Sequence, residues 1–183
     1  RQREKGSVSH GMPIDEEQFG PLAGRIGRAL GHHDAEPTQR CAPRRYPSPM
    51  TLPPEFAGLH SPLGAKMGLE LLEVAPDHAV GRMPVEGNTQ PFGMWHGGAT
   101  GVLAETLGSL AATAHAMTLD KVAVGLELNA THHRSARSGW VTGTATALSL
   151  GRQVAAYQIE LVDDHNRRIA TARLTCQLLE RRS

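Results

Sequence analysis

The chain has almost no excess of charge of either sign and few aromatic side chains. Its 183 residues include 19 lysines and arginines and 18 aspartates and glutamates, which gives a formal charge of +1 at pH 7. A charge so close to zero provides no overall field that would attract nucleic acid or an anionic membrane surface. Aromatic residues make up 4% of the chain, which argues against the stacking platforms that bind single-stranded nucleic acid. We therefore expect no nucleic acid and no membrane among its partners.

Cysteine is also scarce, and the sequence has no long uninterrupted apolar run. The two cysteines, Cys41 and Cys176, lie far apart, and no C-x-x-C spacing indicates a metal site. We expect free thiols in a reducing cytoplasm, with Cys176 in the core, and neither a metal nor a cofactor. No N-terminal run combines positive charge with an apolar segment, so no signal peptide is expected. The longest apolar stretch is interrupted by Glu105 and is too short to cross a bilayer.

The composition changes about a third of the way along the chain. Residues 1–54 hold eight of the twelve prolines, and each proline fixes φ and removes a backbone donor. We predict an N-terminal extension that is partly helical or disordered and that ends in a proline-rich linker. A short helix can form between Asp15 and Leu30, where apolar residues fall near one face. Residues 55–183 are predicted to form one regular domain, which is long enough to bury a core.

The regular part reads as two strands, one long helix and about four more strands. Residues 66–74 and 78–85 predict two strands joined by a turn at Ala75–Asp77. The helix is predicted over 97–117, and the later strands over 121–134, 139–150, 152–164 and 167–179. In the first of these later strands, alternation places Val122, Val124, Leu126 and Leu128 on one face. One helix and one antiparallel sheet make an α+β domain, with the sheet curled around the helix that buries its apolar face.

The predicted helix has two different faces. Its bulky residues recur at helical spacing and define a face that we expect to pack on the sheet: Leu103, Leu107, Leu110, Ala114 and Met117. A second stripe carries small side chains and one carboxylate: Gly98, Gly101, Glu105, Ser109 and Ala112. Small residues let another backbone or a ligand approach closely. Glu105 has no lysine or arginine between residues 90 and 120 to pair with, which leaves two interpretations, a solvated helix residue or a general base.

The start of this helix suggests a second chemical group. The first N–H groups of a helix lack intrahelical partners and lie at the positive end of the helix dipole. Because Gly97 and Gly98 have no side chains, an oxyanion or a polarised carbonyl could approach their N–H groups. Glu105 lies about 12 Å further along the helix axis, too far to act on the same atom. Two subunits with antiparallel helices would bring the base of one to the helix start of the other.

Three segments of the chain together resemble a known family. TQPFGMWHGGATGVLAETLGSLA, VGLELNATHHRSARSG and LSLGRQ are similar to the hotdog-fold acyl-CoA thioesterases. The similarity is best to the branch of the 4-hydroxybenzoyl-CoA, 1,4-dihydroxy-2-naphthoyl-CoA and enterobactin-proofreading thioesterases, and it covers about residues 59–179. The resemblance implies hydrolysis of an aryl- or acyl-CoA thioester at sites built between subunits of a homodimer or homotetramer.

The resemblance also implies roles for five residues. Glu105 matches the family's catalytic glutamate, which acts as nucleophile or as general base. Gln90 matches a glutamine that helps to bind and polarise the thioester from the partner subunit. Gly97 matches the glycine whose N–H binds the thioester oxygen, and His96 a histidine near the leaving thiolate. Ser109 matches a serine or threonine that orients the water or the carboxylate. His96 could also simply cap the helix, Ser109 could be a packing residue, and Gln90 could be a loop residue.

A second group of residues is implied in binding coenzyme A. The candidates for its phosphates are His132, His133, Arg134, Arg137, Ser149 and Arg152, and arginine suits phosphate geometry. They could equally be solvated surface residues. Trp95 departs from the aliphatic residue common at its position in relatives, so it is expected to reshape the acyl pocket. Two other functions stay open on the same fold: a hydroxyacyl dehydratase and a non-catalytic acyl-CoA binding module.

Overall fold

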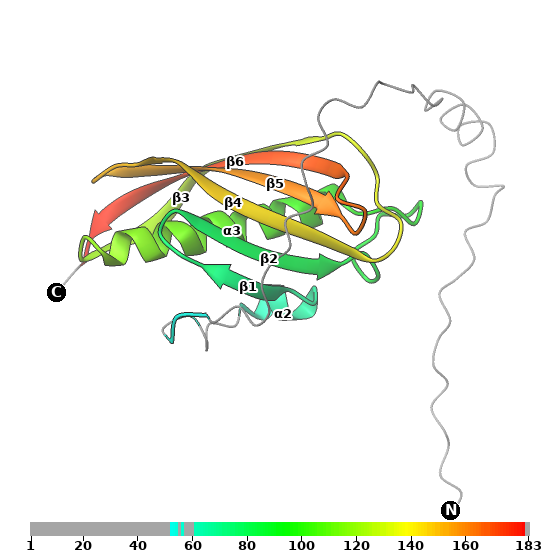
Figure 1. Cartoon of the computed structure of the whole chain (residues 1–183), viewed down its shortest axis with the longest axis horizontal. Helices are drawn as coiled ribbons and strands as arrows, with labels where there is room; N and C mark the ends of the chain where they lie inside the picture. The colour runs from blue at the N-terminus through cyan, green and yellow to red at the C-terminus, as the bar shows by residue number, and fades with distance from the viewer. Residues whose placement is uncertain (1–51, 55, 57–60, 182–183) are drawn as a thin grey trace, which may run out of the picture. The chain divides into compact units, whose positions relative to one another are not determined.

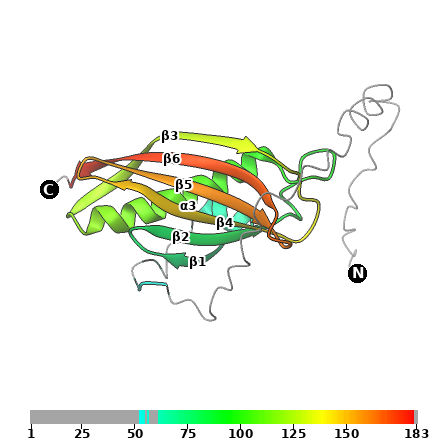
Figure 2. The same ribbon diagram turned by 45° about the horizontal axis from the view of Figure 1, so that its top comes forward.

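The computed structural model describes residues 52–54, 56 and 61–181. Within them lie α2 (Pro62–Lys66), β1 (Glu70–Val74), β2 (His78–Pro84), α3 (Gly97–Met117), β3 (Lys121–His132), β4 (Trp140–Leu150), β5 (Val154–Asp163) and β6 (Arg168–Glu180). The strands form one antiparallel sheet in the order β1-β2-β4-β5-β6-β3. The sheet wraps around α3 along its length, as the two views in Figures 1 and 2 show. The α+β hotdog arrangement expected from the sequence is confirmed.

The bulky face of α3 fits into a notch in the sheet. Leu103 and Leu107 are fully buried, and Leu107 lies over a pair of opposed glycines, Gly81 in β2 and Gly143 in β4. A Cβ at Gly81 would lie 2.9 Å from Leu107 Cδ2, and a Cβ at Gly143 would lie 2.7 Å from Leu107 Cδ1. These glycines therefore let the helix approach the sheet closely. Met117, which the periodicity placed on the same face, is 41% exposed at the helix end.

The small-residue stripe of α3 and the neighbouring Gly108 face β3 and β6. Gly108 packs against Leu174 of β6, where a Cβ would meet Leu174 Cδ2 at 2.5 Å and Leu174 Cβ at 3.1 Å. Gly101 has more room, because a Cβ there would lie 3.9 Å from Leu128 Cδ2 of β3. This side of α3 is therefore packed in part by side chains of β3 and β6 from the same chain. The expected packing role of Cys176 is confirmed, since this β6 residue is fully buried in the core.

The prediction that four apolar residues share one face of β3 is wrong. The pairing of β3 with β6 shifts register between Gly125 and Glu127, and such a bulge reverses the side to which later side chains point. Val122, Val124 and Leu126 are 41%, 42% and 56% exposed. Leu128, which follows the bulge, pairs with Leu174 and packs against the core.

The first predicted strand also begins too early. Lys66 ends the short helix α2, and Gly68 adopts a left-handed φ of 68° before β1 begins at Glu70. The turn at Ala75–Asp77 and the helix bounds 97–117 are confirmed. The predicted helix between Asp15 and Leu30 lies outside the described residues, and the domain boundary at residues 54 and 55 stays a prediction. In the part of the chain that the structure describes, no helix has the length and apolar content needed to cross a membrane.

Substitutions of Gly108 and Gly101 in α3 give a paired test of this packing. We expect Gly108→Ala to lower the free energy of unfolding by about 1–3 kcal/mol, because the added methyl overpacks the contact with Leu174. Gly101→Ala should instead raise it by about 0.5–1 kcal/mol, because alanine has the higher helix propensity and finds room. Urea denaturation followed by circular dichroism measures both changes. Equal effects of the two substitutions would contradict this account of the helix–sheet contact.

Candidate active site

The start of α3 is capped by its own histidine. His96 is the N-cap residue, and its Nδ1 accepts a hydrogen bond from the Gly98 N–H at 2.7 Å. The Gly98 N–H is therefore occupied, which corrects the expectation that both glycine N–H groups are open to a ligand. Within the described part of the chain, the Gly97 N–H has no hydrogen-bond partner, and Gly97 is exposed. This leaves one N–H at the positive end of the helix dipole that can bind an oxygen.

A second histidine, His132, lies directly beside Gly97. A Cβ at Gly97 would lie 3.2 Å from His132 Cε1 and 3.3 Å from His132 Nε2, so the absence of a side chain at Gly97 makes room for the imidazole. His132 is the last residue of β3 and is exposed. Leu128, Ala130 and His132 are two residues apart, so they share the face of β3 that turns toward α3. The sequence raised His132 as a candidate for CoA phosphates, and the packing of β3 on α3 brings it to the helix start.

The Gln90 side chain closes a tight loop just before the helix. Gln90 Oε1 accepts from the Phe92 N–H at 2.9 Å, and the Gln90 N–H donates to the Met94 carbonyl at 2.8 Å. Arg137, from the β3–β4 connection, donates to the Phe92 carbonyl at 3.3 Å. This hydrogen bond from Arg137 holds the β3–β4 connection against the loop that contains Gln90.

Trp95 belongs to the core beneath the helix start. Its indole is 7% exposed, and its Nε1–H donates to the Thr100 hydroxyl at 2.7 Å. Its backbone N–H donates to the Ala136 carbonyl at 2.8 Å. The indole therefore packs beneath the helix start, and the Trp95 backbone holds the β3–β4 connection against it.

Glu105 lies on the half-buried small-residue stripe, and only one of its carboxylate oxygens is held. The Ser109 hydroxyl, one turn later, donates to Glu105 Oε1 at 3.0 Å. The same oxygen faces Gly125 of β3, where a Cβ would lie 2.8 Å from it. Among the described residues, Glu105 Oε2 has no hydrogen-bond partner and the carboxylate forms no ion pair. An anchored carboxylate with one open oxygen can act as a base or as a nucleophile.

Cys176 lines the base of this carboxylate site. It pairs with Gly125 across β3 and β6. Burial raises the pKa of the Cys176 thiol to about 11, the nearby negative charge of Glu105 acts in the same direction, and a hydrogen bond with Ser109 opposes it. The thiol therefore stays protonated at neutral pH, and Cys176 is a small apolar packing residue rather than a nucleophile.

The structure keeps the carboxylate and the helix start apart within one chain. Glu105 lies eight residues after Gly97 on α3, which is about 12 Å along the axis. His96, Gly97 and His132 are gathered at the helix start, and Gln90 lies in the loop that leads to it. Glu105 and Ser109 are gathered two turns later.

The candidate CoA-binding residues form two groups at opposite ends of α3. His133 and Arg134 follow β3 near the helix start, where both backbone N–H groups donate to the Ile169 carbonyl at 2.8 and 3.2 Å. Ser149 and Arg152 lie at the β4–β5 turn, which His115 of α3 holds by donating to the Gly151 carbonyl at 2.9 Å. The ends of α3 marked by Gly97 and His115 are about 27 Å apart along the axis, so one chain does not unite the two groups.

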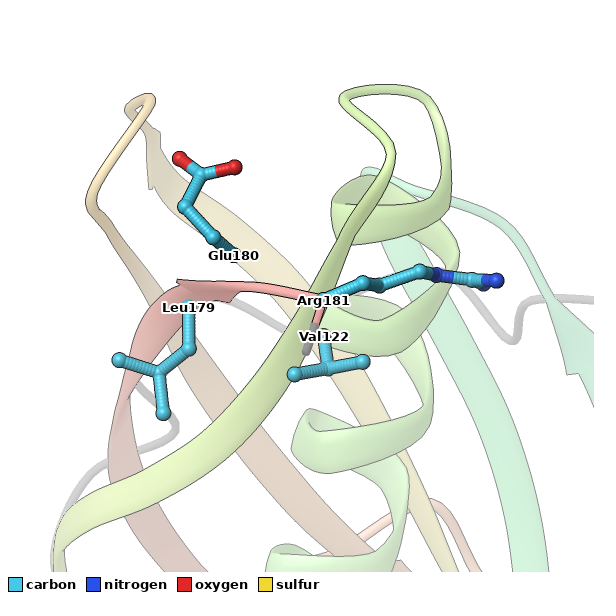
Figure 3. Close-up of a pocket in the computed structure, with 4 residues that line it drawn as sticks. All are labelled: Val122, Leu179, Glu180 and Arg181. Carbon is cyan, nitrogen blue, oxygen red and sulfur yellow. The ribbon is translucent and has the colours of Figure 1, made fainter. Parts of the chain in front are cut away.

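A shallow hollow at the far end of the sheet holds none of the predicted site residues. Figure 3 shows its lining, which consists of Val122, Leu179, Glu180 and Arg181 at the paired ends of β3 and β6. Its apolar residues lie on adjacent strands and its charged residues at the strand end. Glu180 forms an ion pair with Lys121 at 2.7 Å and Arg181 one with Asp120 at 3.6 Å, so both charges already have partners, and the candidate site remains at Glu105 and the helix start.

Known proteins are similar to this chain in both sequence and fold. The family model described as the thioesterase superfamily matches residues 92–170. A protein of Deinococcus radiodurans named "Putative esterase" is 40% identical over 126 residues, covering 69% of this chain and 79% of that protein. The crystal structure of a thioesterase from Haemophilus influenzae is 38% identical with a TM-score of 0.59, covering 64% of this chain and 82% of that one.

A third relative was solved with single residues replaced. A thioesterase from Staphylococcus aureus, solved as a glutamine-to-alanine variant, is 30% identical with a TM-score of 0.57, and the match covers 64% of this chain and 98% of that one. A glutamate-to-alanine variant of the same protein has also been solved. The chain described here belongs to the thioesterase superfamily. Its hotdog fold and its membership support thioester hydrolysis as the class of activity.

The protonated state of the buried thiol can be measured directly. In a Cys41→Ser variant, which leaves Cys176 as the only cysteine, the folded protein should not react measurably with a thiol reagent at pH 8. The reason is that burial and the raised pKa suppress both access and thiolate formation. One equivalent of thiol should react after unfolding in urea. Rapid stoichiometric labelling of the folded variant would contradict the placement of Cys176 behind Glu105.

Proposed function

We propose that the protein hydrolyses an aryl- or acyl-CoA thioester to the free acid and coenzyme A, with Glu105 as the catalytic carboxylate. The observation that carries this proposal is the asymmetric state of Glu105. Oε1 is anchored by Ser109 while Oε2 is open, in a half-buried position without a cationic partner among the described residues. A carboxylate that serves only as a surface charge has no need of such an anchor. The superfamily membership supports the same chemistry.

The active site is proposed to form between two copies of the chain. β3 lies at the edge of the sheet, is 12 residues long and exposes Val122, Val124 and Leu126. A long apolar edge strand is a template for pairing with another strand. Antiparallel pairing of two β3 strands about a two-fold axis would continue the sheet and set two α3 helices side by side in opposite directions. Gly97 of one copy would then approach Glu105 of the other.

The proposed reaction uses the two ends of this shared site. Glu105 Oε2 attacks the thioester carbonyl carbon, or removes a proton from a water that attacks it. The developing oxyanion binds the Gly97 N–H of the other copy, assisted by the helix dipole. The carbon–sulfur bond then breaks, and its electron pair leaves with the CoA thiolate. Attack by water gives the free acid directly, whereas attack by Glu105 gives a mixed anhydride that a water molecule then hydrolyses, which releases the acid and restores the Glu105 carboxylate. Because His96 Nδ1 accepts from the Gly98 N–H, the proton of a neutral His96 ring lies on Nε2, where it can stabilise the thiolate.

The same pairing gives the CoA-binding residues a common role. His133, Arg134 and Arg137 lie near the start of α3, whereas Ser149 and Arg152 lie near its end. With Gly97 of one copy opposite Glu105 of the other, the helix end of that other copy lies on the same side as the first helix start, with its His115 about 15 Å beyond Gly97. We therefore propose that CoA phosphates bind between the first group of one copy and the second group of the other, where arginine supplies bidentate donors.

The spacing of two residues in a relative supports the proposed roles of Gln90 and Glu105. The glutamine and the glutamate replaced in the Staphylococcus aureus thioesterase lie 15 residues apart in its sequence. Gln90 and Glu105 also lie 15 residues apart. In this chain the first lies in the loop before α3 and the second on its third turn, and Gln90 is proposed to polarise the thioester from the partner copy.

The proposal predicts a large loss of turnover without Glu105. Glu105→Ala and Glu105→Gln should each lower kcat at least about 10²-fold, the share that a positioned base contributes. Thiol release from a panel of aromatic and aliphatic acyl-CoAs measures this loss and also identifies the acyl group. Glu86→Gln, at an exposed glutamate outside the site, is the matched control and should retain turnover. A Glu105→Ala variant with near-normal kcat would end the assignment.

The same assay separates hydrolysis from the two other functions. A dehydratase would convert a 3-hydroxyacyl thioester into a product with enoyl absorbance and release no thiol. A binding module would bind acyl-CoA tightly without releasing thiol. The superfamily match favours hydrolysis, so thiol release without enoyl absorbance is expected.

The shared site predicts that assembly and activity are lost together. Leu126 is 56% exposed on the edge strand and Leu63 is 53% exposed on α2. Leu126→Lys should reduce the molecular mass in size-exclusion chromatography with light scattering and abolish thiol release, because a charge on the edge blocks strand pairing. Leu63→Lys changes an equally exposed leucine and should alter neither. A monomeric wild-type protein with full activity would contradict the two-copy site.

A further inference from the structure

One glycine of the edge strand has no backbone reason to be glycine. Gly125 is absent from the glycines with positive φ, which in the described residues are Gly68, Gly87, Gly93 and Gly139. Its conformation is therefore open to any residue. What Gly125 provides is space, because a Cβ would lie 2.8 Å from Glu105 Oε1, 3.7 Å from Cδ and 3.9 Å from Oε2.

We propose that Gly125 is a positioning residue that sets the direction of the Glu105 carboxylate. Its missing side chain allows Oε1 to lie against the β3 backbone, within reach of the Ser109 hydroxyl at 3.0 Å. Because Oε1 points toward the strand, Oε2 is the oxygen left for the substrate or for water. This inference rests on the proposed function, since it assigns the reacting oxygen of the proposed catalytic carboxylate.

The neighbours of Gly125 restrict where the carboxylate could otherwise go. Cys176 lies opposite Gly125 in register and is fully buried, so it blocks movement toward the core. Ser109 lies on the same stripe of α3 one turn after Glu105. The register of β3 against β6 shifts just after Gly125, and such a bulge bends the strand at this point. A methyl group at residue 125 would thus displace Oε1 away from Ser109 and reorient both oxygens.

Stability and catalysis should respond differently to such a methyl group. The atom it meets is the end of a flexible side chain and not backbone, so the carboxylate can swing aside with little loss of stability. Gly→Ala at a position with a compatible backbone also stabilises a protein by restricting the unfolded chain. A displaced catalytic group, however, loses its alignment with the reacting carbon.

The test is the Gly125→Ala variant, assayed for thiol release and for thermal unfolding. We expect kcat to fall about 10- to 100-fold, the effect of a misplaced catalytic group, while KM and Tm stay near their wild-type values. Glu86→Gln, at an exposed glutamate outside the site, is the control and should keep both kcat and Tm. If Gly125 were merely structural, Tm would fall instead, and a kcat near the wild-type value would overturn the proposal.

A second measurement does not depend on activity. In a Glu105→Ala background, the methyl of Gly125→Ala enters the space that the carboxylate has left. Gly125→Ala should therefore raise Tm by about 2 °C or more beyond its effect in the wild type, as contacting residues couple. Additive effects on Tm would overturn the steric link between the two residues. Full turnover by Glu105→Ala would instead refute the proposed function, so the two failures are distinguishable.

Discussion

The close approach of α3 to the sheet is the constraint on which the other features of this molecule depend. A helix with bulky side chains can lie close to a strand only where the facing residues are small. Here glycines of the sheet, and one glycine of the helix itself, provide that space. Leu107 lies over Gly81 and Gly143, which are register partners in neighbouring strands. At Gly108 the roles are reversed. The glycine is on the helix, and the side chain of Leu174 in β6 packs into the space that it leaves. Dense packing of this kind fixes the helix along its whole length.

The candidate site uses the same device for a polar group. Glu105 lies against Gly125 as Leu107 lies against Gly81 and Gly143, but the group accommodated is a carboxylate and the strand is the edge strand. A leucine in a glycine notch is buried and inert. A carboxylate in a glycine notch at the edge of the sheet has one oxygen anchored by Ser109 and one oxygen open. The difference between core and site is therefore one of position in the sheet, since β3 has a neighbour on one side only.

The sequence could predict the features that depend on local periodicity. The bounds of α3 and its two faces follow from helical spacing, and the succession of strands along the chain follows from alternation and turn residues. The placement of β3 beside β6 could not be predicted in this way. The face of β3 could not be predicted in this way, because one extra residue near Leu126 reverses the alternation while leaving the sequence pattern intact. The side chains of the site depend on contacts that are distant in sequence. His132 beside Gly97, and Gly125 beside Glu105, arise from the packing of β3 on α3, and no spacing within either segment encodes them.

In the proposed mechanism, His96 combines helix capping with a catalytic role in one side chain. The sequence left a choice between a helix cap and a catalytic residue. The cap engages Nδ1 through the Gly98 N–H, and an imidazole that accepts at Nδ1 carries its proton at Nε2 when neutral. The cap thereby fixes both the ring orientation and the tautomer, which a histidine on a loop would have to select by other means. It also occupies the N–H of Gly98 and leaves that of Gly97 open, so a single hydrogen bond determines which backbone donor would face a substrate in the proposed site. A histidine that only capped the helix could be replaced by serine or aspartate with little consequence, whereas neither of those side chains presents an N–H donor at the open helix start.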